Sequence, residues 1–249
     1  MPEKVFKFDF SKQDDQQKFD ASSQEIKDEV LKEAQEKAQN LNDFMKREGL
    51  KDPEEAIEKI LAKTRTALSN GYVDVVLKIK DYFSIAPEKL EQAAFEGFKN
   101  CLAEGFIKNA LEIKDNFSIV SEQLALPEVE QAALEGLKNC LANGYVDGAL
   151  EIKDNFPIAL ERLEQAAFEG LKNCLARGSV DEALEIKNNF PIAPEQLTLP
   201  EVKQAAFEGL KDRLARGYIN DALKIKDHFP IAPEQLALPE VEQAAFEGL

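Results

Sequence analysis

The stretch EGLKNCLA occurs at residues 135–142 and again, unchanged, at residues 169–176, with close variants EGFKNCLA at 96–103 and EGLKDRLA at 208–215. A glycine lies two residues after each copy, and together with Gly71 these glycines are separated by 34, 39, 34 and 39 residues. The longer interval contains five extra residues, such as ALPEV, in a proline-bearing connector. Internal repeats of about this length are typical of solenoids, propellers and arrays.

Periodicity within one copy distinguishes between these architectures. In the copy at residues 163–192, apolar and small residues of the first half follow the i, i+3, i+4, i+7 spacing of an amphipathic helix. Gly178 then ends the helix, and a second, shorter apolar face runs over residues 180–190 up to Pro191. No run in the copy has the pattern of a strand. We therefore expect an all-α fold, namely a right-handed α-solenoid of tandem helix-turn-helix repeats with a 34/39-residue period.

The first helix of each copy has an unusually wide apolar face. An arc of roughly 200° exceeds what one neighbouring helix covers, so we expect this helix to pack against both its own partner and the next repeat. Gly170 lies within this face although glycine costs about 1 kcal/mol of helix propensity relative to alanine. This position indicates a close approach of two helices.

The segment GSVDEALEI (178–186) resembles the turn and the start of the second helix of tetratricopeptide and pentatricopeptide repeats. The resemblance rests on Gly178, Asp181, Ala183 and Leu184, and 34 residues is the length of a tetratricopeptide repeat. It covers the turn and the second helix, whereas the first helix lacks the large aromatic, the Leu-Gly pair and the Tyr of tetratricopeptide repeats. The resemblance implies stacked helical hairpins that bind a partner.

Three regions follow from these patterns. We expect a flexible leader at residues 1–21 and an N-terminal capping helix at 22–49, which starts at a capping box of Ser22 and Glu25 and stops at Gly49. Residues 53–249 are expected to form the α-solenoid, with five helical hairpins beginning near residues 53, 87, 126, 160 and 199 and an incomplete sixth. The last helix has the sequence of an internal one, so we expect either a longer natural chain or head-to-tail docking onto another copy.

Composition limits the classes of partner. The chain has 47 acidic and 31 basic residues, a formal charge of −16 and a pI near 4.7. Phosphate backbones and anionic membranes attract Lys and Arg, so this charge opposes nucleic acid and membrane partners and favours a basic protein or peptide. No segment has the unbroken apolar length of a membrane span, and the N-terminal residues lack the apolar core of a secretion signal. We expect a cytoplasmic protein.

Catalytic chemistry is not indicated. His228 is the only histidine, and it occupies a position held by Tyr or Asn in other copies, which predicts a surface side chain. Cys101, Cys140 and Cys174 follow the repeat and are expected to be inert core thiols. One lysine near the end of each second helix, such as Lys153, is expected to be stabilised by the helix dipole and to extend its stem over apolar surface. A row of lysines that contacts an anion is the alternative. We predict no catalytic residues, no cofactor and no metal site.

Two repeated surface features are candidates for partner binding. Polar stripes with a spacing of four would align into a ladder able to hydrogen-bond an extended peptide, although a merely solvated face is the alternative. Exposed aromatic residues beside the turn glycines would be anchors on one edge, although drift at tolerant positions explains them equally well. The stripe residues are Gln131, Glu135, Asn139, Gln165, Glu169 and Asn173, and the turn aromatics are Tyr72, Phe106, Tyr145 and Tyr218.

These observations favour a non-enzymatic helical-repeat scaffold that binds a protein or peptide. One alternative is a single-stranded RNA reader of the pentatricopeptide kind, which the variable turn residues favour and the net charge opposes. A second alternative is a structural protein that self-assembles through its uncapped C-terminal end.

Overall fold

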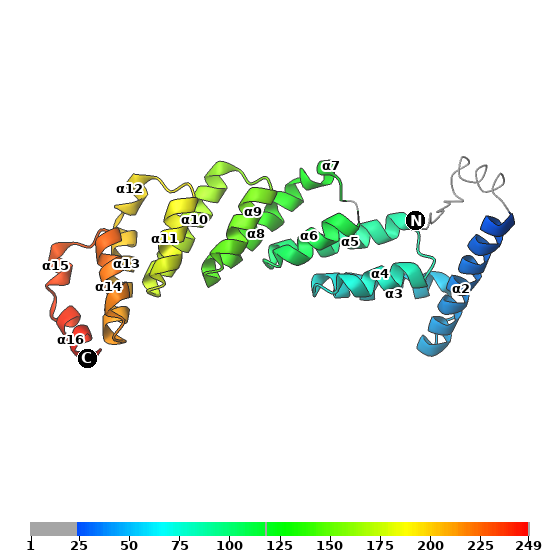
Figure 1. Cartoon of the computed structure of the whole chain (residues 1–249), viewed down its shortest axis with the longest axis horizontal. Coiled ribbons are helices and arrows are strands. Elements are labelled where there is room, and N and C mark those ends of the chain that lie inside the picture. The colour runs from blue at the N-terminus through cyan, green and yellow to red at the C-terminus, as the bar shows by residue number, and fades with distance from the viewer. Residues whose placement is uncertain (1–23, 118, 249) are drawn as a thin grey trace. The chain divides into compact units, whose positions relative to one another are not determined.

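The computed structural model describes residues 24–117 and 119–248 (Figure 1). Within these residues every regular element is a helix, which confirms the all-α prediction. The chain divides into two compact units, the first made of Met1–Leu68 and Tyr72–Ala94 and the second of Ser69–Gly71 and Phe95–Leu249. The expected leader at residues 1–21 and the expected capping box at Ser22 lie outside the described residues.

The first unit contains α2 (Gln24–Glu48), α3 (Pro53–Ser69, except its last residue), α4 (Val73–Tyr82) and the start of α5 (Pro87–Ala103). Its core forms where α2 packs against α3 and α4, around Phe44, Ala56 and Ile60. The ring of Phe44 meets the ring of Phe83 edge-on, with 5.9 Å between centroids. The Asn40 side chain also donates a hydrogen bond of 3.0 Å to the Tyr82 carbonyl oxygen, so α2 is fixed to the end of α4 by apolar and polar contacts.

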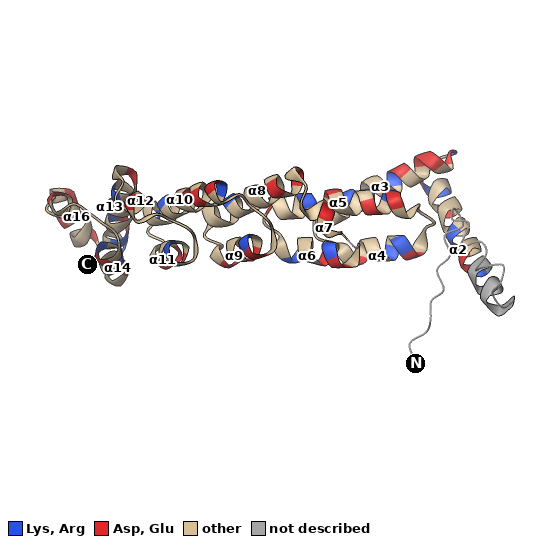
Figure 2. Cartoon of the chain, turned by 90° about the horizontal axis from the view of Figure 1, so that it is seen from above, with Lys and Arg blue, Asp and Glu red and all other residues tan. Residues whose placement is uncertain are grey.

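The second unit contains two rows of helices. After the end of α5, the long helices are α8 (Pro127–Asn143), α10 (Leu160–Ala176), α13 (Pro200–Ala215) and the shorter α16 (Pro239–Glu247). The short helices are α6 (Ile107–Asn116), α9 (Val146–Asn155), α11 (Val180–Asn189) and α14 (Ile219–His228). From α8 on, each long helix packs against the next long helix, and from α6 on each short helix packs against the next short one, as the two rows in Figure 2 show. Helix α10 thus contacts α8, α11 and α13, which is why its apolar face is so wide.

The two 39-residue intervals and the connector before α16 contain short helices, where the sequence predicted connectors alone. These four-residue helices are α7 (Ser121–Leu124), α12 (Pro194–Leu197) and α15 (Pro233–Leu236). In each, a glutamine side chain reaches back to the main-chain N–H that precedes the helix, as Gln196 does to Ala193 at 2.9 Å. Proline at the first position of α12 and α15 also fits a helix start. The recurring Pro-Glu-Gln-Leu sequence was therefore the signal for an extra turn of helix.

Glycine has two separate structural roles. Gly144 ends α8 with a φ of 80°, and Gly178 follows α10 with a φ of 70°, so both adopt the left-handed conformation that terminates a helix. Gly170 has the second role, because a Cβ atom at this position would lie 2.7 Å from the Leu141 Cβ atom of α8. The interpretation of Gly170 as a position of close helix packing is confirmed.

The three cysteines are buried thiols that form no disulfide bond. Burial raises the pKa of the Cys101 thiol to about 11 and also raises the pKa values of Cys140 and Cys174. Cys140 Sγ lies 3.9 Å from the Gly105 carbonyl oxygen, and Cys174 Sγ lies 3.8 Å from the Leu141 carbonyl oxygen. These side chains fill the contact with the preceding copy, as expected for inert core thiols.

Candidate functional site

The turn aromatics all lie at the start of a short helix. Each is the residue immediately before α4, α6, α9 or α14, and each is at least half exposed. Tyr145 is the most exposed of them at 69%. The exposure predicted for Tyr72, Phe106, Tyr145 and Tyr218 is therefore present, whereas their role as partner anchors stays a prediction.

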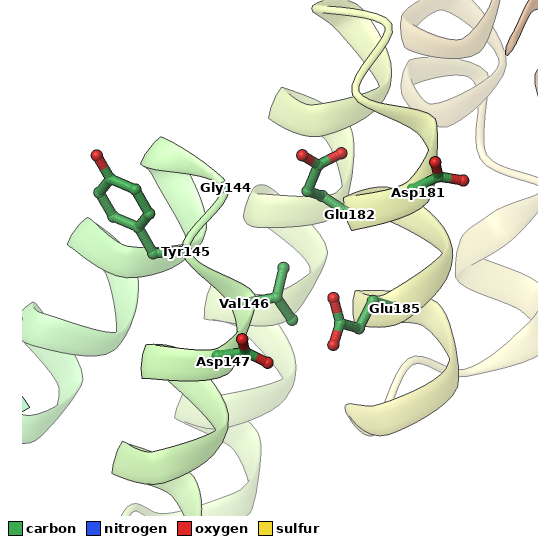
Figure 3. A pocket seen from close by; sticks show the side chains of 7 residues that line it. All are labelled: Gly144, Tyr145, Val146, Asp147, Asp181, Glu182 and Glu185. Carbon is green, nitrogen blue, oxygen red and sulfur yellow. The ribbon is translucent and has the colours of Figure 1, made fainter.

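One of these residues, Tyr145, borders a hollow between α9 and α11 with a volume of about 370 Å³. We call it the acidic hollow, because four of its lining residues carry carboxylates. Figure 3 shows Asp147 and Glu185 directed into the space between the two helices and Glu182 extending toward the turn at Gly144. The Tyr145 ring projects away from α11 in this view. The lining residues are Gly144, Tyr145, Val146, Asp147, Asp181, Glu182 and Glu185.

The carboxylates differ in whether they have a basic partner. Asp181 forms an ion pair of 2.8 Å with Lys224 of α14. In the described part of the chain, Asp147, Glu182 and Glu185 form no ion pair within 4.0 Å. The acidic hollow therefore presents three uncompensated negative charges.

Helix geometry explains how the fold accommodates these like charges. Asp147 lies in the first turn of α9, and Asp181 and Glu182 lie in the first turn of α11. The N-terminus of a helix carries a partial positive charge that stabilises carboxylates there. Two adjacent helix starts therefore bring these acidic residues together, and only Asp181 of the four has an ion pair among the described residues.

The corresponding positions of neighbouring junctions are less acidic. Between α6 and α9 the sequence places Lys108 where Asp147 lies and Gly148 where Glu182 lies. Between α11 and α14 it places Asn220 and Lys224 where Asp181 and Glu185 lie. The concentration of carboxylates is thus specific to the α9–α11 junction.

The acidic side chains are not gathered into a metal centre. Among the residues that the structure describes, no three His, Cys, Asp or Glu side chains are placed so that they could hold a metal ion. The same residues include no helix with the length and apolarity needed to cross a bilayer.

The six residues of the predicted polar ladder are exposed, but they differ in whether their side chains have a bonding partner. Asn139 of α8 donates a hydrogen bond of 2.8 Å to the Ala103 carbonyl oxygen, and Gln131 accepts one from Arg162. Glu169 of α10 forms an ion pair of 3.0 Å with Lys172. The remaining members, Glu135, Gln165 and Asn173, have no side-chain hydrogen bond or ion pair to another described residue. Part of the ladder therefore joins helices, and whether the rest binds a peptide stays a prediction.

Gln165, Glu169 and Asn173 lie together in a second hollow, of about 220 Å³, between α8 and α10. We call it the α8–α10 groove. Its lining residues are Lys138, Ala142, Gln165, Ala166, Glu169, Gly170 and Asn173. The stripe of α10 therefore borders a depression, which the helical spacing alone did not predict.

Lys153 and Lys187 extend over apolar rings, as expected, but the helix end that each contacts belongs to the next short helix and not to its own. Lys153 Nζ donates a hydrogen bond of 3.0 Å to the Asn189 carbonyl oxygen and lies over the Phe190 ring. Lys187 does the same at the end of α14, with a hydrogen bond of 3.1 Å to the His228 carbonyl oxygen. Each of these lysines thus stabilises the C-terminus of the next short helix.

Two further predictions concern the chain's surface. The His228 side chain is exposed, as its position in the copies predicted. Phe246 of α16 is 73% exposed, whereas its counterparts Phe168 and Phe207 are 7% and 3% exposed. The exposed Phe246 ring provides an apolar surface that a second copy could cover, but self-association itself stays a prediction.

Comparison with protein families, with curated proteins and with solved structures found no match to this chain. The resemblance to tetratricopeptide and pentatricopeptide repeats therefore remains one of short sequence segments.

Sequence reasoning singled out Tyr145 but missed Glu182, Glu185 and Lys138. Glu182 carried a signal, because it departs from its counterparts Asn109, Gly148 and Asp221. Lys138 is the same residue in the other copies, and what differs there is its neighbours, Leu134 and Arg162. Such departures become informative once the structure shows which helix starts are neighbours.

Proposed function

We propose that this chain is a non-enzymatic helical-repeat scaffold, an α-solenoid, which binds a basic segment of a protein partner at the acidic hollow. The observation that carries the proposal is that Asp147, Glu182 and Glu185 line one hollow without an ion pair among the described residues. Lysine and arginine side chains of a partner would supply the missing charge.

The packing of successive long and short helices supports the scaffold part of the proposal. Because each helix of such a stack contacts only its neighbours, surface residues at one junction can diverge while the core contacts stay the same. The α9–α11 junction illustrates this, since its buried Ala149 and Ala183 recur as Ala110 and Ala222, whereas its full set of surface carboxylates does not recur at a neighbouring junction. A binding site on this junction needs no change in the core.

The exposed Tyr145 adds an apolar surface beside the acidic hollow. Its ring points away from α11, so it would contact a partner residue next to the one held by the carboxylates. Tyrosine is enriched among residues that dominate binding energies, and its ring face attracts arginine. A segment with adjacent basic residues fits this arrangement.

Titration of a fluorescein-labelled hexa-arginine peptide tests the proposal by fluorescence anisotropy. Neutralising the hollow with Glu182→Gln and Glu185→Gln removes two carboxylates that each contribute about 0.2–1 kcal/mol to an exposed pair. We expect binding about 2- to 30-fold weaker at low salt.

General attraction of a polycation to an acidic protein requires a charge-matched control. Glu122→Gln with Glu195→Gln removes the same charge from exposed residues of α7 and α12 that form no ion pair in the described part of the chain. This control should bind the peptide nearly as the unmodified protein does. Equal weakening in both double variants would show that the acidic hollow has no specific role.

A further inference from the structure

A lysine on the outer side of three long helices is held by the same contacts each time. Each forms ion pairs with a glutamate three residues earlier and with a glutamate of the next long helix, at 2.8–3.3 Å. Each also lies about 5 Å over a phenylalanine ring, at 4.9–5.0 Å from the centroid. The sets are Lys99 with Glu96, Glu128 and Phe95, Lys172 with Glu169, Glu201 and Phe168, and Lys211 with Glu208, Glu240 and Phe207.

These contacts outweigh the effect of burial on the three lysines. Partial burial lowers the pKa of Lys172, but hydrogen bonds to Glu201 and Glu169 raise it by more, and the resulting pKa lies above its ordinary value. The same balance raises the pKa values of Lys99 and Lys211. The charges of Lys99, Lys172 and Lys211 are therefore paired with glutamates of this chain.

Lys138 of α8 occupies the fourth such position and has none of these contacts. Leu134 replaces the phenylalanine, and Arg162 replaces the glutamate of the next long helix. Lys138 forms no ion pair with any described residue, including Glu135 three residues earlier, and its side chain is exposed. Arg162 itself binds back to α8 through Glu130, at 3.2 Å, and Gln131.

The α8–α10 groove brings this lysine beside side chains that also lack partners. Asn139, the counterpart of Asn173, donates a hydrogen bond to the carbonyl oxygen of Ala103 in the preceding long helix. The equivalent oxygen for Asn173 belongs to Ala142, and Arg177 Nη1 already binds it at 2.6 Å. The Asn173 amide is consequently left facing the groove, as is that of Gln165.

The groove has the dimensions and chemistry of a site for extended peptide. Gln165 and Asn173 are two helical turns apart, about 12 Å, which is close to the length of three to four residues of extended chain. Side-chain amides donate and accept hydrogen bonds as main-chain groups do. Ala142, Ala166 and Gly170 between them are small and leave room for a main chain to approach.

Charge at the groove favours an acidic residue in such a peptide. Glu169 is compensated by Lys172 at 3.0 Å, whereas Lys138 is uncompensated. We propose that the α8–α10 groove binds an extended peptide segment, with an Asp or Glu side chain of that segment paired to Lys138. This site is separate from the acidic hollow, since it is formed by the long helices and selects the opposite charge.

An array of acetylated heptapeptides tests the proposal, with Asp, Glu, Asn, Gln or Lys at the central position and varied flanking residues. Peptides with central Asp or Glu should bind more tightly than their Asn or Gln counterparts. For the tightest of them, Lys138→Gln should weaken binding about 1.4- to 5-fold, as expected for loss of one exposed ion pair. Lys226→Gln, which removes the same charge from an exposed lysine of α14, should leave binding unchanged.

A second variant keeps Lys138 but gives it an ion-pair partner within the chain, so that it no longer binds a peptide carboxylate. Arg162→Glu restores the glutamate found at the other junctions, so it should capture Lys138 and weaken peptide binding while circular dichroism stays unchanged. Equal binding of acidic and amide peptides, or no loss with Lys138→Gln, would overturn the proposal. Glu182→Gln with Glu185→Gln should not weaken acidic peptides, so this result is independent of the acidic hollow.

Discussion

Gly209 of α13 lies directly against the main-chain carbonyl oxygen of Leu175 in α10, so closely that a Cβ atom at residue 209 would overlap this oxygen. Gly136 of α8 has the same relationship with the Leu102 carbonyl oxygen of α5. In both cases the obstacle is main chain, which cannot rotate aside as a side chain can. The glycine thus sets the distance between two long helices.

Replacing this glycine should separate the helices. For Gly209→Ala we expect the free energy of unfolding to fall by about 1–3 kcal/mol, because overpacking outweighs the better helix propensity of alanine. Urea denaturation followed by circular dichroism measures the change. In the control Gly148→Ala, the new Cβ atom meets only Cys140 Sγ at 3.2 Å, and stability should stay equal or rise by up to about 1 kcal/mol. Equal stability of Gly209→Ala and the unmodified protein would contradict the close contact.

Acid should weaken the contact between α2 and α3. Hydrogen bonds from Lys59 and Lys63 lower the pKa of Glu48 to about 2, against a desolvation effect that raises it. Because this pKa lies below the unfolded value of 4.5, the stabilisation is complete above pH 4.5 and is lost as the pH falls toward 2. Carbon-detected NMR titration of the Glu48 carboxyl group should therefore give a midpoint well below 4.5.

Matched variants locate the cause of that shift. Lys59→Gln with Lys63→Gln should return the Glu48 midpoint to near its ordinary value. Lys51→Gln removes an exposed lysine with no ion pair among the described residues and should leave the midpoint in place. An unchanged midpoint in the double variant would rule out the two lysines as the cause.

The thiols should resist modification in the folded protein. The pKa of Cys101 is raised from 9.0 to about 11, which lowers its thiolate fraction at pH 8 about a hundredfold, and burial restricts access further. Ellman's reagent should therefore react far more slowly with the native protein than with protein in 6 M guanidinium chloride, where all three thiols are exposed. Rapid reaction of even one thiol in the native protein would show that a cysteine is accessible.

The sequence predicted the helices and their buried faces because both depend on local spacing. Leu171, Cys174 and Leu175 are fully buried on the face that the spacing defined, and α10 ends before Gly178. The short helices α7, α12 and α15 were missed because four residues are too few to show helical periodicity. The all-α class thus followed from pattern alone.

The candidate sites depended on the alignment of neighbouring helices, which the pattern of a single helix does not contain. Lys172 pairs with a glutamate 29 residues later across a 39-residue interval, whereas the 34-residue interval between α8 and α10 places Arg162 beside Glu130. Asn139 and Asn173 occupy the same place in their copies, yet only Asn139 is bonded to the preceding helix. Such differences arise from contacts between copies, so they required the structure.

The carbonyl groups at the ends of successive long helices are bonded by side chains that come much later in the chain. Asn139 binds the Ala103 oxygen, Arg177 binds the Ala142 oxygen and Arg213 binds the Arg177 oxygen, at separations of 36, 35 and 36 residues. During synthesis on the ribosome, these carbonyl oxygens therefore have no side-chain partner until the following copy has emerged. In nascent chains arrested between two copies, the last turn of the most recent long helix should stay frayed. The helix ends should therefore become protected one after another, in the order in which the copies are synthesised.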